Sequence, residues 1–176
     1  MKKIKVLLCS LAIAGFGFTS CEDDDDNNGN SNTIEGTYTL REVNTQNATD
    51  FDEDGTSHIN QKEESDCYDG ARIVLRSDQT FTFDNNYILV DETNGTDTCA
   101  EASFDGTYTV ESGTGGNAVI TATYEDNNQN DVVLVLIKEG NELSYTVGGL
   151  FAQYPDRDDN GGAIYTNGSV EYVFRK

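Results

Sequence analysis

Short runs in which apolar and polar residues alternate, separated by Gly, Asn and Asp, occupy most of this chain and restrict it to a β-fold. No comparable stretch repeats its apolar residues with a helical period. A single proline, Pro155, falls between two of the runs and interrupts none. The pattern therefore predicts an all-β domain with strands at residues 37–43, 71–76, 80–84, 87–90, 103–111, 118–124, 131–138, 142–147 and 169–175.

Alternation along these strands predicts one bulky, largely aromatic buried face, because successive side chains of a strand point to opposite sides. The expected members of this core are Tyr38, Leu40, Ile73, Leu75, Phe81, Phe83, Phe104, Tyr108, Val110, Ile120, Tyr124, Leu143, Tyr145, Val147, Tyr172 and Phe174.

The clearest hairpin joins residues 131–138 to 142–147, because Gly140 and Asn141 tolerate the positive φ that a tight turn needs. Residues 132–137 are apolar at every position, whereas one face of a barrel wall normally meets water. We therefore expect the outer side of this strand to be covered by a loop, by residues 87–90 or by a partner subunit.

The β-pattern begins at Ile34, and residues 34–176 have the usual length of one domain. Residues 22–33, E-D-D-D-D-N-N-G-N-S-N-T, contain no apolar side chain and cannot offset the entropy of ordering. Residues 21–33 are therefore expected to form a disordered tether with a reach of about 20 Å.

The chain begins with Lys2, Lys3 and Lys5, an apolar run over residues 6–18, and Thr19-Ser20-Cys21. These features predict a secretory signal peptide at residues 1–20, since the run is shorter and less apolar than a membrane-spanning helix requires. The position of Cys21 resembles the lipobox of bacterial lipoproteins, and the acidic residues behind it resemble the surface-export tag of Bacteroidota. This resemblance implies that Cys21 is acylated and anchors the protein in the outer membrane, facing the cell exterior. The alternative is a plain signal peptide with an incidental cysteine.

Removing residues 1–20 would leave 8 basic against 32 acidic residues, a formal charge of −24. Such a charge repels nucleic acid and anionic lipid head groups. A nucleic-acid partner is therefore not expected, and solubility is the simplest reason for the acidity.

Four motifs follow one another in the domain. They are G-T-Y-T-L from Gly36, an acidic D-x-D-x-D-G loop ahead of Cys67, G-T-Y-T-V from Gly106 just after Cys99, and a terminal E-Y-V-F-R-K. Their order resembles the lipocalin-like lipoproteins of Bacteroidota, although Tyr38 stands where lipocalins usually place a tryptophan. The resemblance implies a single antiparallel up-and-down barrel of about eight strands, which holds either packed side chains or one small ligand. A two-sheet β-sandwich is the alternative.

Cys67 and Cys99 are the cysteines that remain once Cys21 is acylated and Cys9 is removed with the signal peptide. An exported compartment permits disulfides, so we expect these two to pair. The alternative is a reactive thiol assisted by His58, the single histidine of the chain.

The acidic loop places Asp50, Asp52 and Asp54 at alternate positions, followed by Gly55 and Thr56. This spacing directs three carboxylates and the Thr56 carbonyl towards one point, as calcium requires. The twelfth position holds glutamine instead of the glutamate of an EF-hand, so the alternative is an acidic solvated turn.

A weaker version of this acidic pattern occurs at Asp156, Asp158 and Asn160, where Arg157 argues against a cation site. The alternative there is a surface loop between strands.

We expect a surface-anchored binding module for a small apolar or glycan-like ligand. The alternative is a structural or adhesive surface protein that calcium stiffens and that has no small ligand. An enzyme is not expected, because the chain has no nucleophile elbow, no zinc-type histidine cluster and no phosphate loop.

Overall fold

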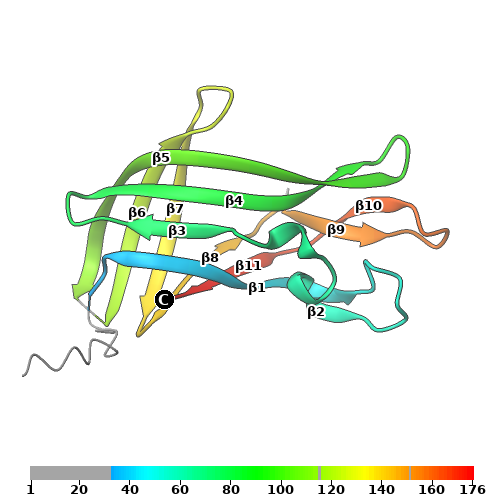
Figure 1. Cartoon of the computed structure of the whole chain (residues 1–176), viewed down its shortest axis with the longest axis horizontal. Helices are drawn as coiled ribbons and strands as arrows, with labels where there is room; N and C mark the ends of the chain where they lie inside the picture. Colours follow the sequence, from blue (N-terminus) through cyan, green and yellow to red (C-terminus); the bar gives the residue numbers. More distant parts are fainter. Residues whose placement is uncertain (1–32, 115, 151) are drawn as a thin grey trace, which may run out of the picture.

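Eight antiparallel strands form a closed barrel in the computed structural model, which describes residues 33–114, 116–150 and 152–176 (Figure 1). Around the barrel they follow the order β11-β8-β7-β6-β5-β4-β3-β1, and β11 pairs with β1 to close it. The up-and-down barrel is confirmed, and the sandwich alternative is wrong. The strands are β1(Gly36–Thr49), β3(Arg72–Leu75), β4(Thr80–Asp91), β5(Thr96–Thr114), β6(Asn117–Glu125), β7(Asp131–Glu139), β8(Glu142–Val147) and β11(Val170–Arg175).

Three further strands and two 3₁₀ turns lie outside this barrel wall. They are β2(His58–Asn60), which pairs with β1, the turns η1(Gln61–Glu63) and η2(Asp66–Tyr68), and the hairpin β9(Gln153–Arg157) with β10(Ala163–Asn167). The sequence pattern predicted none of these strands. Pro155, expected between strands, lies within β9, where a two-stranded ribbon leaves one edge free of ladder hydrogen bonds.

The two strands expected at residues 80–84 and 87–90 are one continuous strand, β4. Asn85 and Asn86 separate them in the pattern, because asparagine is depleted in strands. In the structure both residues pair with β5 in unbroken register, opposite Ala102 and Glu101. The long β4–β5 hairpin thus extends past the barrel and lies over β9 and β10 (Figure 1).

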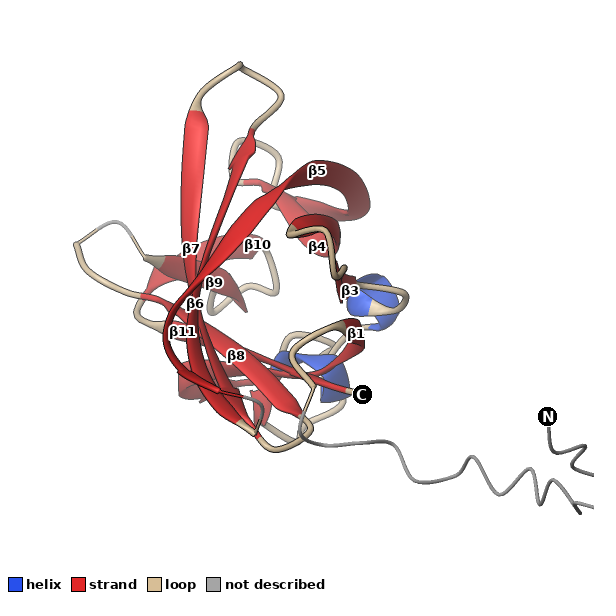
Figure 2. Ribbon diagram, turned by 90° about the vertical axis from the view of Figure 1, so that its left-hand side faces the viewer, coloured by secondary structure: helices blue, strands red, loops and turns tan. Residues whose placement is uncertain are grey.

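The barrel has two different ends. One end, which we call the closed end, carries the β3–β4, β5–β6 and β7–β8 turns together with the start of β1 and the C-terminus (Figure 1). Here the Nζ of Lys176 donates a hydrogen bond to the Thr33 carbonyl over 2.8 Å. The opposite end carries the 3₁₀ turns, the β4–β5 turn and the β9–β10 hairpin (Figure 1). Figure 2 shows the molecule from the left-hand side of Figure 1, where the closed end lies, with the strands wrapped around the interior.

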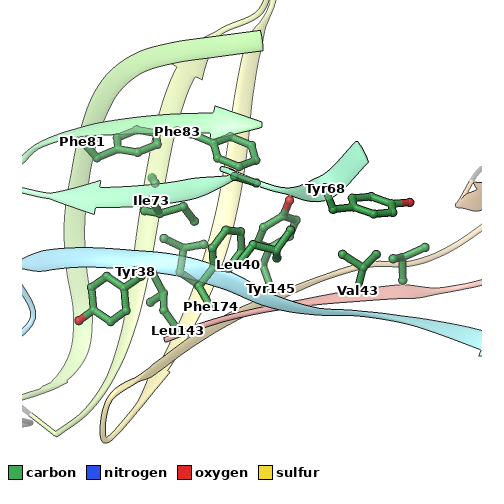
Figure 3. Close-up of a cluster of buried hydrophobic side chains, with 14 of the residues drawn as sticks. Tyr38, Leu40, Val43, Tyr68, Ile73, Phe81, Phe83, Leu143, Tyr145 and Phe174 are labelled. Atoms are coloured by element: carbon green, nitrogen blue, oxygen red, sulfur yellow. The ribbon is translucent and has the colours of Figure 1, made fainter. Parts of the chain in front are cut away.

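Side chains fill the barrel towards the closed end (Figure 3). Among the described residues of the barrel, seven apolar side chains have no surface accessible to water: Tyr38, Ile73, Phe81, Ile120, Ala122, Leu136 and Leu143. Burying each large member contributes about 1.5–3 kcal/mol, so this layer supplies much of the stability.

The prediction of burial is wrong for two residues of the expected core. Val110 and Val147 are each 43 % exposed. Val110 immediately precedes a register shift between β5 and β6, which turns its side chain out of the pattern. Val147 is the last residue of β8 and lies beyond the three residues that pair with β7, so no neighbouring strand covers it on that side.

A disulfide joins Cys67 and Cys99, with 4.9 Å between their Cα atoms, and the predicted pairing is confirmed. It attaches η2 to the outside of β5. The bond therefore holds the segment between β2 and β3 against the barrel wall.

Candidate functional site

Several of the predicted features lie outside the described residues. They are Cys21, the signal peptide at residues 1–20 and all but the last residue of the tether. Within the described ranges, no helix has the length and apolar character needed to cross a membrane.

The first acidic loop brings only part of its predicted cation ligands together. Oxygens of Asp50, Asp52 and Glu64 lie within 4.8 Å of one another, and they form the single such acidic group in the described part of the chain. The carboxylate of Asp54 instead accepts the Thr56 N–H over 2.7 Å, and neither residue belongs to the group. Of the predicted carboxylates, Asp50 and Asp52 therefore lie together, and the third acidic side chain beside them is Glu64.

Glu64 is buried and accepts hydrogen bonds at both carboxylate oxygens. Oε2 accepts the Phe51 N–H over 2.7 Å, and Oε1 accepts the His58 N–H over 2.9 Å and contacts His58 Nδ1 at 2.7 Å. The bond to Glu64 raises the pKa of His58. Oxygen ligands of this kind suit a hard cation, but a cation would have to share Glu64 with these donors.

The second acidic loop does not gather its carboxylates. Asp156 lies in β9 and accepts the Thr166 hydroxyl over 2.8 Å, whereas Asp158 closes a turn by accepting the N–H groups of Asn160 and Gly162. Neither aspartate belongs to a three-carboxylate group among the described residues. The expected weak site at Asp156, Asp158 and Asn160 thus has the geometry of a hydrogen-bonded surface turn.

Arg157 connects the two acidic loops. Its Nε donates to the Phe51 carbonyl over 2.9 Å, its guanidinium lies 4.1 Å from the centre of the Phe51 ring, and it pairs with Asp97 at 2.9 Å. A guanidinium that combines these three contacts fixes the first loop against β9 and β5.

The most distinctive group of side chains is a set of five aromatic rings on the inner wall, which we call the aromatic site. Its members are Phe83, Phe104, Tyr124, Tyr145 and Tyr172. Phe104 and Tyr124 lie 4.7 Å apart, centre to centre, and Tyr145 stacks on Tyr172 at 4.8 Å. Phe83 lies between the two pairs, 6.1 Å from Tyr124 and 6.2 Å from Tyr145.

Strand register explains why these rings share one face. Phe83 lies opposite Phe104, and Tyr145 lies opposite Tyr172, and directly opposed residues of an antiparallel pair project to the same side. Phe83 and Tyr145 are buried, whereas Phe104, Tyr124 and Tyr172 are only half-buried, contrary to the fully buried core expected for them. The inner wall is therefore packed tightly at the closed end and more loosely at the aromatic site.

The tyrosine hydroxyls differ between these two levels. At the closed end, Tyr38 donates to the Ile34 carbonyl and Tyr108 donates to the Arg76 carbonyl, each over 2.7 Å. In the described part of the chain, the hydroxyls of Tyr124, Tyr145 and Tyr172 make no hydrogen bond to protein. The single fully buried side-chain polar atom without a partner there is Gln61 Oε1, so these three hydroxyls are not sealed from water.

These hydroxyls remain protonated at neutral pH. Burial raises the pKa of Tyr172 to about 12. It also raises the pKa of Tyr124 and raises the pKa of Tyr145 well above 10.0. The neighbouring phenol of Tyr172 raises the pKa of Tyr145 further. Neutral phenols both donate and accept hydrogen bonds, so the aromatic site offers apolar ring faces beside several unused polar groups.

Sequence reasoning recognised the aromatic side chains but assigned all of them to the core. Alternation shows which face a side chain occupies, but it does not show whether a hydroxyl meets a carbonyl. No protein-family model matches the chain, and comparisons with curated proteins and with solved structures find no match.

Proposed function

We propose that this chain is a surface-anchored lipoprotein whose barrel binds a small ligand at the aromatic site. The observation that carries the proposal is the set of three hydroxyls, on Tyr124, Tyr145 and Tyr172, that make no hydrogen bond to protein in the described residues. A filled barrel with a purely structural role gains nothing from phenols that lack partners, since apolar rings of the same shape pack equally well.

The chemistry of the site favours a neutral ligand with a flat apolar face and a few hydroxyl or carbonyl groups. Ring faces of Phe104 and Tyr172 offer stacking surface, and the phenols offer hydrogen bonds. A compact sugar or an aromatic compound with oxygen substituents has this chemistry. An anionic ligand does not fit a chain that has 32 acidic residues.

Acylation of Cys21 remains part of the proposal. The described chain starts at the closed end of the barrel, so an anchor there would direct the closed end towards the membrane (Figure 1). The opposite end, with the β4–β5 turn and the β9–β10 hairpin, would then face away from the cell surface.

The test uses the soluble chain from residue 22 and the neutral fluorescent probe N-phenyl-1-naphthylamine. Because Tyr172 provides one stacking face, Tyr172→Ala is expected to weaken probe binding about tenfold. Tyr87→Ala is the matched control, since Tyr87 is also half-buried but is not one of the five rings of the site. Equal binding by both variants and the parent chain would refute the aromatic site.

A second candidate function is a structural surface protein that calcium stiffens. The observation that favours it is the convergence of Asp50, Asp52 and Glu64 oxygens within 4.8 Å. We expect calcium to raise the unfolding temperature relative to EDTA, and we expect Asp52→Asn to abolish that rise. Asp158→Asn is the control. An unfolding temperature that does not respond to calcium would identify the loop as an acidic turn.

A further inference from the structure

Strand β7 has one paired edge and one edge that is mostly unpaired. It pairs with β6 along all nine of its residues, but with β8 only at Ile137, Lys138 and Glu139. Beyond these residues β7 and β8 diverge (Figure 1). Residues 131–136 therefore have no ladder partner on the β8 side within the described chain.

Alternation of backbone groups shows which residues face this split. Glu139 and Glu142 close the two-residue turn and pair with each other, so the N–H and C=O of Glu139 point towards β8. Residues at intervals of two point the same way. Val135 and Val133 therefore direct their unpaired N–H and C=O groups into the split, and Thr146 of β8 directs its own from the other side.

Beyond the charged Asp131 at its start, the free edge carries none of the features that usually protect one. Natural proteins block exposed edges with lysine, proline, bulges or short strands. Residues 132–137 contain no charged residue and no proline, and β7 pairs with β6 without a register shift. On the outer face Val133 is 57 % exposed and Val135 54 % exposed. The expected cover for this face is not present in the described chain.

A groove of about 450 Å³ lies where β7 and β8 begin to diverge, over the end of their paired part and the start of the split. It is lined by Val135, Ile137 and Thr146 on its strands, reaches Tyr145 on the inner wall, and is bordered by Glu139 and Glu171. Glu142 also borders it but is paired with Arg175 at 3.1 Å. Glu139 and Glu171 make no ion pair among the described residues, so the rim of this largely polar groove carries uncompensated negative charge.

We propose that the split between β7 and β8 binds an extended strand of another protein. The strand would hydrogen-bond to the free edges of Val133 and Val135, place alternate apolar side chains over them, and bring a lysine or arginine to Glu139 and Glu171. The acidic rim selects a basic occupant. A second copy of this chain does not fit the charge, because two molecules with 32 acidic residues each repel one another.

The probe is a fluorescein-labelled peptide, acetyl-KTVTVTVK-amide, measured by fluorescence anisotropy with the chain from residue 22. Val135→Pro removes one N–H from the free edge and leaves the β6 ladder intact, so it should weaken binding about tenfold. Val135→Thr is the matched control and should bind nearly as well, because it keeps that N–H. Glu171→Gln should weaken binding and reduce its dependence on salt.

A second peptide, N-methylated at alternate residues, keeps the test valid even where Val135→Pro fails to fold. It cannot form the backbone ladder, and the proposal requires that it does not bind. Equal binding of the methylated peptide would overturn the proposal. Sedimentation of the chain alone as a dimer that Val135→Pro dissociates would also overturn it, because the occupant would then be a second copy.

Discussion

At the scale of single residues, Gly106 shows how closely the barrel wall is packed. A side chain at this position of β5 would meet the Thr123 carbonyl oxygen and come within 2.6 Å of the Phe81 ring. We expect Gly106→Ala to destabilise the fold by about 1–3 kcal/mol, because neither the β6 backbone nor a buried ring can move freely. Gly148→Ala is the control, since nothing lies within 4 Å of that position. Urea unfolding of the two variants measures the difference, and equal stabilities would contradict it.

His58 and Glu64 give a second prediction at this scale. The hydrogen bond to Glu64 raises the pKa of His58 above 6.5, so protonated His58 stabilises the folded state. This stabilisation is complete below pH 6.5 and is lost as the pH rises through the raised pKa. His58→Gln should therefore lower the unfolding temperature most at mildly acid pH and least at alkaline pH. The same loss at both pH values would show that only an uncharged hydrogen bond is involved.

At the scale of elements, the disulfide controls how firmly η2 is held to β5. Cys67 and Cys99 are 32 residues apart, and closing a loop of this length stabilises a fold by about 3 kcal/mol. The double variant Cys67→Ser, Cys99→Ser should lose about that much in urea unfolding. The barrel ladder itself should persist, because Cys67 lies in η2 outside the barrel wall and Cys99 is exposed on β5. Unchanged stability would show that η2 docks without the covalent link.

The strands that could be predicted are those with strict alternation. Leu40, Phe81 and Leu143 lie on the expected face because a strand has a period of two. The pattern fails where distant contacts decide the outcome. Asn85 and Asn86 remain in β4 because β5 pairs with them, and Val147 is exposed because β7 turns away from β8. Neither fact is encoded within a window of neighbouring residues.

The candidate sites, like the strands, could be predicted only where neighbouring residues in the sequence carry the signal. The Cys67–Cys99 pair follows from cysteine counting, and the spacing of Asp50 and Asp52 identifies two of the three clustered carboxylates. Glu64 could not be identified, because it joins the cluster only when η1 folds back over the loop. The sequence also could not show that the Tyr172 hydroxyl lacks a protein partner, because the pattern is the same for a tyrosine whose hydroxyl is hydrogen-bonded and for one whose hydroxyl is not.

At the scale of the whole molecule, the tyrosines predict how the barrel unfolds in alkali. Burial raises the pKa of Tyr38, Tyr68 and Tyr145 above 10.0, so the folded state keeps protons that the unfolded state loses. Stability is complete below pH 10.0 and falls as the pH rises above it. In an alkaline pH titration, the tyrosinate absorbance should therefore rise over the same pH range in which the circular dichroism spectrum of the folded barrel is lost. Ionisation of all tyrosines with an unchanged dichroism spectrum would contradict this.

The hydrogen bond from Lys176 to Thr33 brings the first and last described residues within reach of each other at the closed end. A short peptide joining them would make the barrel a continuous ring, and that ring could be cut again in the β4–β5 turn near Asn94 without changing any strand pair. Such a circular permutant would begin at the opposite end of the barrel. An anchor attached to its new start would hold the molecule upside down, so orientation on a membrane depends on where the ring is cut and not on the barrel itself.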